Sequence, residues 1–263
     1  MQAATVFARP LPDGGTIGVA APASPYESRS DVLRSVEWWE SQGYRVKLAE
    51  HVLAQDDFVA GSAADRGGDL TGLFADPEVD VVQCLQGGYG SAQVIPHLDF
   101  DTIAANPKPF VGFSDITALH VAVRQRAGLA TFYGNGFLGV GATETTDFSR
   151  ERLLAVLKGG GAGEVPSNPD DSFLRTLRGG SVTAPLAGGC LWLLMQTFGS
   201  PWELDLDGAI LFFEDYYLPP YYLDGILTQL AHAGKLAGVR GVVVGEMEKC
   251  DWGDLRQVSD WAR

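Results

Sequence analysis

The amino-acid sequence predicts an α/β protein built on a parallel, doubly wound sheet. Two observations lead to this fold class. Short, continuous apolar runs alternate along the chain with segments of helical periodicity, which is the pattern of strands covered by helices on both faces. Glycine, at 33 of 263 residues, is about twice as frequent as usual and gathers at the expected strand ends and turns.

In the N-terminal half, apolar runs alternate with helical segments. The first run ends at Pro22, and the next helix carries Leu33, Val36 and Trp39 on one face and stops at Gly43. The expected elements are strands 16–20, 44–48, 79–85 and 110–113 and helices 31–42, 62–74, 91–97 and 116–126. Strands 16–20, 79–85 and 110–113 should be parallel neighbours in one sheet, because each is apolar throughout and is followed by a helix.

The sequence divides into two α/β regions and a connector. Residues 1–142 form the first region. Residues 143–181 are polar and in places rich in glycine and proline, with one expected helix over 148–157, and we interpret them as a connector. A second, smaller α/β domain covers residues 182–263. It is expected to hold strands 209–213 and 239–244, with a helix over 223–233 between them.

Composition excludes several classes of protein. The formal net charge is −14 and there is no basic stripe, so neither nucleic acid nor an anionic membrane is an expected partner. Cys84, Cys190 and Cys250 lack paired spacing, which argues against a disulfide framework and against a zinc site. No apolar run reaches the roughly 18 residues of a transmembrane helix, and the N-terminus does not read as a signal peptide. The expected location is the cytoplasm.

Ser114 lies on the turn between strand 110–113 and helix 116–126, at the carboxyl end of a strand, where α/β sheets bind ligands. The N–H groups of the first helical turn can face a developing negative charge there. The alternative is that Ser114 is only an N-cap, with its hydroxyl accepting from the N–H of Ile116 or Thr117. The α/β-hydrolase pattern does not decide between them, because Ile116 stands where that pattern has its second glycine.

Two more loops follow predicted strands. The turn at residues 87–91, Gly-Gly-Tyr-Gly-Ser, lets backbone N–H groups approach a substrate and could supply an oxyanion donor beside the N–H of Asp115. It is neither a dinucleotide fingerprint nor a P-loop, and it could equally be a structural turn. Glu214 follows an apolar strand and could orient a histidine in a triad, or be a solvated loop acid.

A serine nucleophile needs a base, and the chain has four histidines. His120 lies six residues beyond Ser114, about 9 Å along a helix, so it cannot take the Ser114 proton directly. His232 is expected at a helix end, where it would favour the helix dipole. His51 and His97 lie in or near loops and have no supporting motif. We therefore expect structural or surface roles for all four.

Six segments carry a resemblance that extends from about residue 16 to residue 245. They are residues 87–91, 112–119, 131–134, 188–191, 210–215 and 227–230. In this order and spacing they resemble the LD-carboxypeptidase family of serine peptidases, which includes a microcin-immunity branch. The resemblance implies a flavodoxin- or Rossmann-like N-terminal domain, a smaller C-terminal α/β domain and a homodimer.

The resemblance also implies a chemistry, a Ser-His-Glu triad that uses no metal or other cofactor. Ser114 would be the nucleophile, Glu214 would orient the histidine, and the N–H groups of Gly88 and Asp115 would hold the oxyanion. Ser114, Gly88 and Glu214 would then face one cleft between the domains, with strained backbone at Ser114. The family cleaves an amide after an L-centre in a small peptide or aminoacyl amide, typically releasing D-alanine from cell-wall tetrapeptides.

This sequence departs from the family pattern in several places. Many relatives have arginine at the position of Gln86, asparagine at Cys190, and arginines where this chain has Tyr222 and Gly225. The family's triad histidine lies in a Gly-His segment beyond the strand at 239–244, and no histidine here matches it. We therefore expect a chain that is incomplete at its C-terminus. The alternative is a non-catalytic binding protein that keeps the cleft but lacks a base.

Overall fold

The computed structural model describes residues 5–159, 163 and 176–251. The chain forms two compact units, residues 1–179 and 180–263. The boundary between the units falls within residues 143–181, the segment expected to be a connector. Residues 252–263 of the expected second domain lie outside the described part of the chain.

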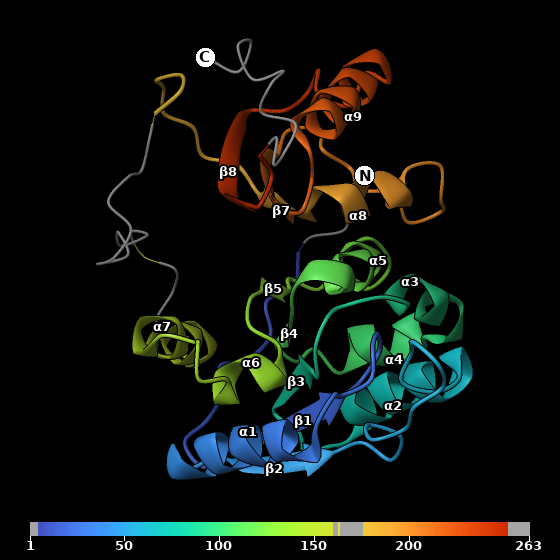
Figure 1. The fold of residues 1–263 in the computed structure, drawn as a ribbon, viewed down its shortest axis with the longest axis vertical. Coiled ribbons are helices and arrows are strands. Elements are labelled where there is room, and N and C mark those ends of the chain that lie inside the picture. Colours follow the sequence, from blue (N-terminus) through green and yellow to red (C-terminus); the bar gives the residue numbers. More distant parts are fainter. Residues whose placement is uncertain (1–4, 160–162, 164–175, 252–263) are drawn as a thin grey trace. The chain divides into compact units, whose positions relative to one another are not determined.

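The first unit contains a parallel five-stranded sheet in the order β2-β1-β3-β4-β5 (Figure 1). Its strands are β1 (Thr16–Ala20), β2 (Arg45–Leu48), β3 (Val81–Cys84), β4 (Phe110–Gly112) and β5 (Phe132–Tyr133). The predicted neighbours are confirmed, since β1 pairs with β3 and β3 pairs with β4, both in parallel. This order has its switch point between β1 and β3, where ligands commonly bind beyond the strand ends.

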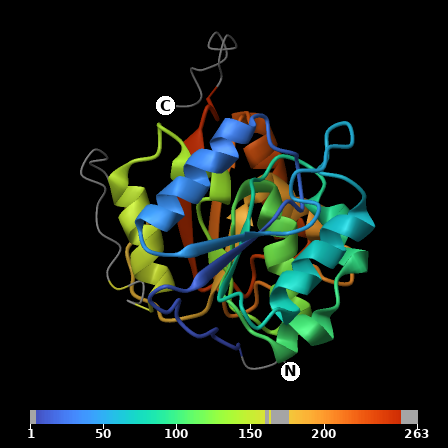
Figure 2. The ribbon, with the colours of Figure 1, turned by 90° about the horizontal axis from the view of Figure 1, so that it is seen from below.

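Helices cover both faces of this sheet (Figures 1 and 2). They are α1 (Arg29–Ser41), α2 (Ala63–Ala75), α3 (Ser91–Val94), α4 (Phe100–Ala105), α5 (Thr117–Ala127), α6 (Phe137–Gly141) and α7 (Asp147–Leu157), with 3₁₀ turns η1 (Ile95–His97) and η2 (Ser114–Ile116). Trp39 of α1, Phe137 of α6 and Leu157 of α7 share one buried cluster with Ile17 and Val81 of the sheet. On the opposite face lie α2, α3, α4 and α5.

Two local differences from the expected helices have clear causes. The helix expected over 91–97 is a short α3 followed by the 3₁₀ turn η1, because Pro96 has no N–H to continue an α-helical ladder. Helix α4 was not expected. Its N-terminus is fixed by Asp99, whose carboxylate accepts from the N–H groups of Asp101 and Thr102 at 3.1 and 3.0 Å.

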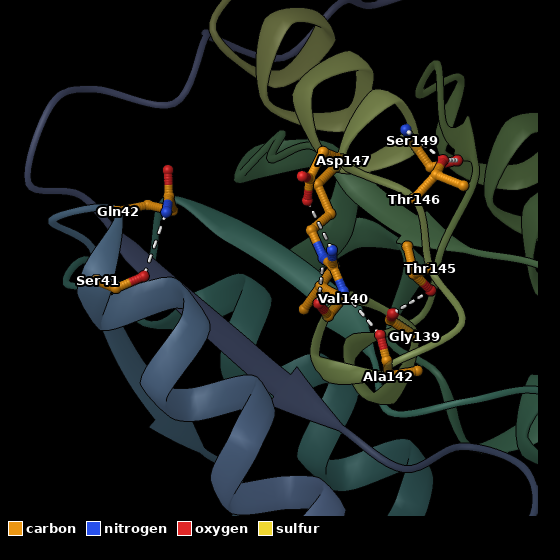
Figure 3. Close-up of polar contacts among 10 residues, drawn as sticks. Ser41, Gln42, Gly139, Val140, Ala142, Thr145, Thr146, Asp147 and Ser149 are labelled. Carbon is orange, nitrogen blue, oxygen red and sulfur yellow. Dashed lines mark hydrogen bonds and ion pairs between the residues drawn. The ribbon is translucent and has the colours of Figure 1, made fainter. Parts of the chain in front are cut away.

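The corner between α6 and α7 is fixed by side chains at the start of α7 (Figure 3). The Arg150 guanidinium donates to the carbonyl oxygens of Val140 at 2.8 Å and Ala142 at 2.7 Å. Thr146 caps α7 by accepting from the N–H of Ser149 at 3.2 Å. Although α7 lies in the expected connector, these contacts join it firmly to the core of the first unit.

The second unit contains a parallel three-stranded sheet in the order β6-β7-β8. Its elements are β6 (Leu186–Cys190), α8 (Leu191–Thr197), β7 (Ile210–Tyr216), α9 (Pro220–His232) and β8 (Gly241–Glu248). Strand β7 continues past the expected end at residue 213, because β8 is long enough to pair with Asp215 and Tyr216. The register shifts between Phe213 and Asp215, so Glu214 lies at an irregularity inside the strand rather than in a loop beyond it.

No helix within the described residues is long and apolar enough to cross a membrane. In the same part of the chain, no group of three or more His, Cys, Asp or Glu side chains is arranged to hold a metal ion.

Candidate active site

Ser114 stands on a strained turn directly after β4. Its φ is 58°, in the left-handed region that a residue with a Cβ rarely occupies, at a cost of about 1–3 kcal/mol. The strain predicted for a nucleophile turn is therefore present. Such strain lifts a serine hydroxyl off the end of a strand and exposes it above the sheet.

The Ser114 side chain does not cap the helix. Neither η2 nor α5 has a side-chain cap, and within the described residues the Ser114 hydroxyl makes no hydrogen bond. The N-cap interpretation is therefore wrong. The Ser114 backbone is held instead, because its N–H donates to the Tyr133 hydroxyl oxygen at 2.7 Å and its carbonyl accepts from the Thr117 hydroxyl at 2.7 Å.

The glycine turn after β3 lies against the Ser114 turn. A Cβ on Gly87 would lie 2.9 Å from the Cβ of Ser114, closer than real Cβ contacts allow. Gly88 has a φ of 104°, and a Cβ there would collide with the Ser24 side chain. Glycine is thus required at Gly87 because the serine turn approaches closely, and at Gly88 because its backbone conformation disfavours a Cβ.

Two side chains hold the glycine turn in place. The Ser24 hydroxyl, in the loop after β1, accepts from the Tyr89 N–H at 3.1 Å. Arg66 of α2 is 2% exposed, and its guanidinium donates to the carbonyl oxygens of Gly90 at 2.9 Å and Pro22 at 2.6 Å. Burial lowers the pKa of Arg66. The loops after β1 and β3, which meet at the switch point of the sheet, are therefore joined through one buried cation.

Asp115 connects the two turns to each other. Its carboxylate accepts from the Ser91 N–H at 2.8 Å, and its carbonyl accepts from the Ser91 hydroxyl at 2.5 Å. Burial raises the pKa of Asp115, while the bonds from Ser91 and the charge of Arg66 oppose that rise. Within the described residues, neither the Gly88 N–H nor the Asp115 N–H donates a hydrogen bond. Gly88 is exposed, whereas Asp115 is buried.

Glu214 belongs to β7 of the second unit and is half-buried. The adjacent Asp215 is buried, and its carboxylate accepts from the N–H groups of Trp192 and Tyr216, both at 2.8 Å. Asp215 therefore has a structural role at the start of α8, and the role of Glu214 as the functional carboxylate stays a prediction. That Glu214 shares a cleft with Ser114 and Gly88 stays a prediction.

None of the four histidines, all within the described residues, is hydrogen-bonded to Ser114. His51 Nδ1 lies 2.9 Å from Asp69 Oδ1, a contact that raises the pKa of His51. His120 is buried, its Nε2 donates to the Gly112 carbonyl at 2.9 Å, and burial lowers its pKa to about 4. His97 and His232 are exposed.

Comparison with known families shows to which family the chain belongs. The LD-carboxypeptidase N-terminal domain matches residues 17–134, and the LD-carboxypeptidase C-terminal domain matches residues 183–262. The chain belongs to the LD-carboxypeptidase family of serine peptidases. The resemblance inferred from the six sequence segments is thereby confirmed.

Relatives of the chain agree with it in sequence and fold. The probable murein peptide carboxypeptidase of Bacillus subtilis is 35% identical over 91% of this chain and 74% of its own. A muramoyltetrapeptide carboxypeptidase from Oxalobacter formigenes superposes with a TM-score of 0.79 at 26% identity, covering 94% of this chain and 81% of its own. A microcin C7 self-immunity protein, solved with adenosine monophosphate, gives 0.83 at 25% identity, covering 97% and 87%.

The sequence did not predict the roles of three residues that shape the candidate site. Arg66 looked like an ordinary polar residue of a helix, although its place on the buried face of α2 was a usable signal. Ser24 gave no signal, and Tyr133 was noted only as part of the resembling segment 131–134, because each acts on a turn that is remote in sequence.

Proposed function

We propose that this chain hydrolyses the amide between an L-centre and a C-terminal D-amino acid, as in a murein tetrapeptide that ends in D-alanine. The observation that carries the proposal is the strained Ser114, whose side chain lies beside the glycine turn and whose hydroxyl makes no hydrogen bond within the described residues. Family membership and the names of the relatives support the coarser statement, a serine carboxypeptidase.

The mechanism begins with attack of the Ser114 hydroxyl oxygen on the scissile carbonyl carbon. A histidine base, oriented by Glu214, takes the hydroxyl proton, and the negative charge on the carbonyl oxygen is held by the N–H groups of Gly88 and Asp115. The C–N bond then breaks as the base returns the proton to the leaving amine. Water, deprotonated by the same base, releases the acid and restores Ser114.

The base is the unassigned part of this mechanism. Among the residues that the structure describes, His51 is bound to Asp69, His120 is buried beneath the serine turn, and His97 and His232 are exposed. The alternative function, a protein that binds a peptide or an aminoacyl amide without cleaving it, follows if no histidine reaches Ser114. Binding and turnover must therefore be measured separately.

The test is release of D-alanine from an L,D-linked tetrapeptide, with affinity for the same peptide measured by calorimetry. Ser114→Ala should abolish release and leave affinity within about threefold, because it removes the attacking atom alone. Ser41→Ala, an exposed serine at the end of α1, is the matched control and should leave release unchanged. Glu214→Gln should reduce release strongly.

Two results would contradict the proposal. If Ser114→Ala still released D-alanine, Ser114 would not be the nucleophile. Tight binding of the D-terminal peptide with no release by the wild-type chain would favour the binding protein instead. An aminoacyl nucleotide amide belongs in the same assay, because the self-immunity protein of similar fold was solved with adenosine monophosphate.

A further inference from the structure

The backbone of Ser114 is held on both sides by side chains. The N–H donates to the Tyr133 hydroxyl oxygen and the carbonyl accepts from the Thr117 hydroxyl, each at 2.7 Å. A left-handed φ of 58° at a serine persists only where surrounding groups over-determine it. These two hydrogen bonds hold the N–H and the carbonyl of the strained residue directly.

Tyr133 is itself fixed in place from two directions. Strand β5 pairs with β4 in parallel, with Tyr133 opposite Gly112, and the Gly134 N–H donates to the Gly112 carbonyl at 3.0 Å. The Tyr133 ring also packs against the ring of His120, with centroids 5.8 Å apart, and His120 donates to the same Gly112 carbonyl. A fixed strand and a fixed ring thus aim the phenol oxygen past the end of β4 at the Ser114 N–H.

The bond to Tyr133 also decides which N–H groups serve the oxyanion. Because the Ser114 N–H already donates to the phenol oxygen, it is not directed at a substrate. The donors are then the N–H groups of Gly88 and Asp115, which donate no hydrogen bond within the described residues. Holding the N–H of Ser114 also fixes the peptide plane before it, and with it the direction of the Cα–Cβ bond.

We propose that Tyr133 is a positioning residue, whose hydroxyl accepts from the Ser114 N–H and holds the nucleophile in its left-handed conformation. This inference rests on the proposed function for its effect on catalysis. The structural part stands on the hydrogen bond and the backbone strain alone. Without the phenol oxygen, the peptide before Ser114 keeps only the bond that its Phe113 carbonyl accepts from the Ile116 N–H at 3.2 Å, so its plane can tilt and the hydroxyl leaves its line of attack.

The test is Tyr133→Phe, which removes one oxygen and keeps the ring that packs against His120. The kcat for D-alanine release should fall about 10- to 100-fold, the range expected when a reacting atom is misplaced by about 1 Å, while KM changes less than about threefold. Hydrogen exchange of the Ser114 amide, measured by NMR, should become at least about tenfold faster, because the bond that protects it is gone.

Tyr44→Phe is the matched control, since Tyr44 is a buried tyrosine packed on Trp39 and has no contact with the serine turn. It should change neither kcat nor Ser114 exchange. Unchanged exchange and unchanged kcat in Tyr133→Phe would overturn the proposal, as would a loss found only in KM. If the wild-type chain releases no D-alanine, the proposed function fails, and the exchange rate alone then supports or overturns the role of Tyr133.

Discussion

His120 should make the first unit sensitive to acid. Its side chain is 5% exposed, Nε2 donates to the Gly112 carbonyl, and within the described residues Nδ1 has no partner. Burial lowers the pKa of His120 from 6.5 to about 4, so the folded protein holds it neutral. In the unfolded chain the same imidazole is exposed to water and takes up a proton readily.

The sign of the effect follows from where the proton binds. Between pH 6.5 and about 4 the unfolded chain holds a proton on His120 that the folded chain does not, so stability is lost as pH falls through this window. The whole difference in pKa corresponds to about 3 kcal/mol at about 1.4 kcal/mol per unit. Between pH 7.5 and pH 5 the loss should be about 2 kcal/mol.

The measurement is urea denaturation at pH 7.5 and pH 5, followed by circular dichroism, for the wild type and His120→Gln. Glutamine keeps an N–H donor for the Gly112 carbonyl but does not titrate. The variant should start from a lower stability and lose about 2 kcal/mol less than the wild type on acidification. Equal losses in the two proteins would show that His120 is not the buried neutral group, and the reasoning would be refuted.

Three further variants probe the turns around the serine. Asp115→Asn removes a buried carboxylate whose pKa is raised in the folded state. The Tm of the variant minus that of the wild type should therefore increase as pH rises from 4 to 7, because the wild type must bury a charge there that the variant lacks. Arg66→Met should lower the free energy of unfolding in urea by at least about 3 kcal/mol, because it leaves buried carbonyl oxygens without a donor. The exposed Arg34→Met is the control and should lower it by less than about 1 kcal/mol. Gly87→Ala should slow D-alanine release, whereas Gly72→Ala, which meets open space in α2, should not.

The sheet of the first unit was predictable because its pattern is local. Strands β1, β3 and β4 are buried on both faces, so their sequences are mostly apolar, with Thr16 and Gln83 as buried polar exceptions, and each leads into a helix. Strand β5 has only two residues, too few to show a period, and was not expected. The length of β7 depends on pairing with β8, which no pattern within β7 reports.

The candidate site was predictable only in part for a related reason. The turn at Ser114 was predictable because a strand, a serine and a helix follow one another in the sequence. The glycine run at residues 87–90 likewise predicted that its backbone could approach a neighbouring group closely. The contacts that hold these turns join residues distant in sequence, such as Ser114 with Tyr133 and Gly90 with Arg66, separated by 19 and 24 positions. Neither periodicity nor spacing reports such pairs, because tertiary folding alone brings them together.

The glycine turn and the serine turn are bonded to each other, and this has a consequence for catalysis. Ser91 gives both its N–H and its hydroxyl to Asp115, so moving one turn away from the other would break two buried hydrogen bonds at about 1–3 kcal/mol each. In the proposed mechanism, the N–H groups of Gly88 and Asp115 would therefore keep their spacing before any substrate arrives. Donors fixed in advance need no reorganisation as charge develops, which is the condition under which oxyanion stabilisation is strongest. Under the proposed function, the strain at Ser114 is the cost of presenting a hydroxyl to that pair of donors.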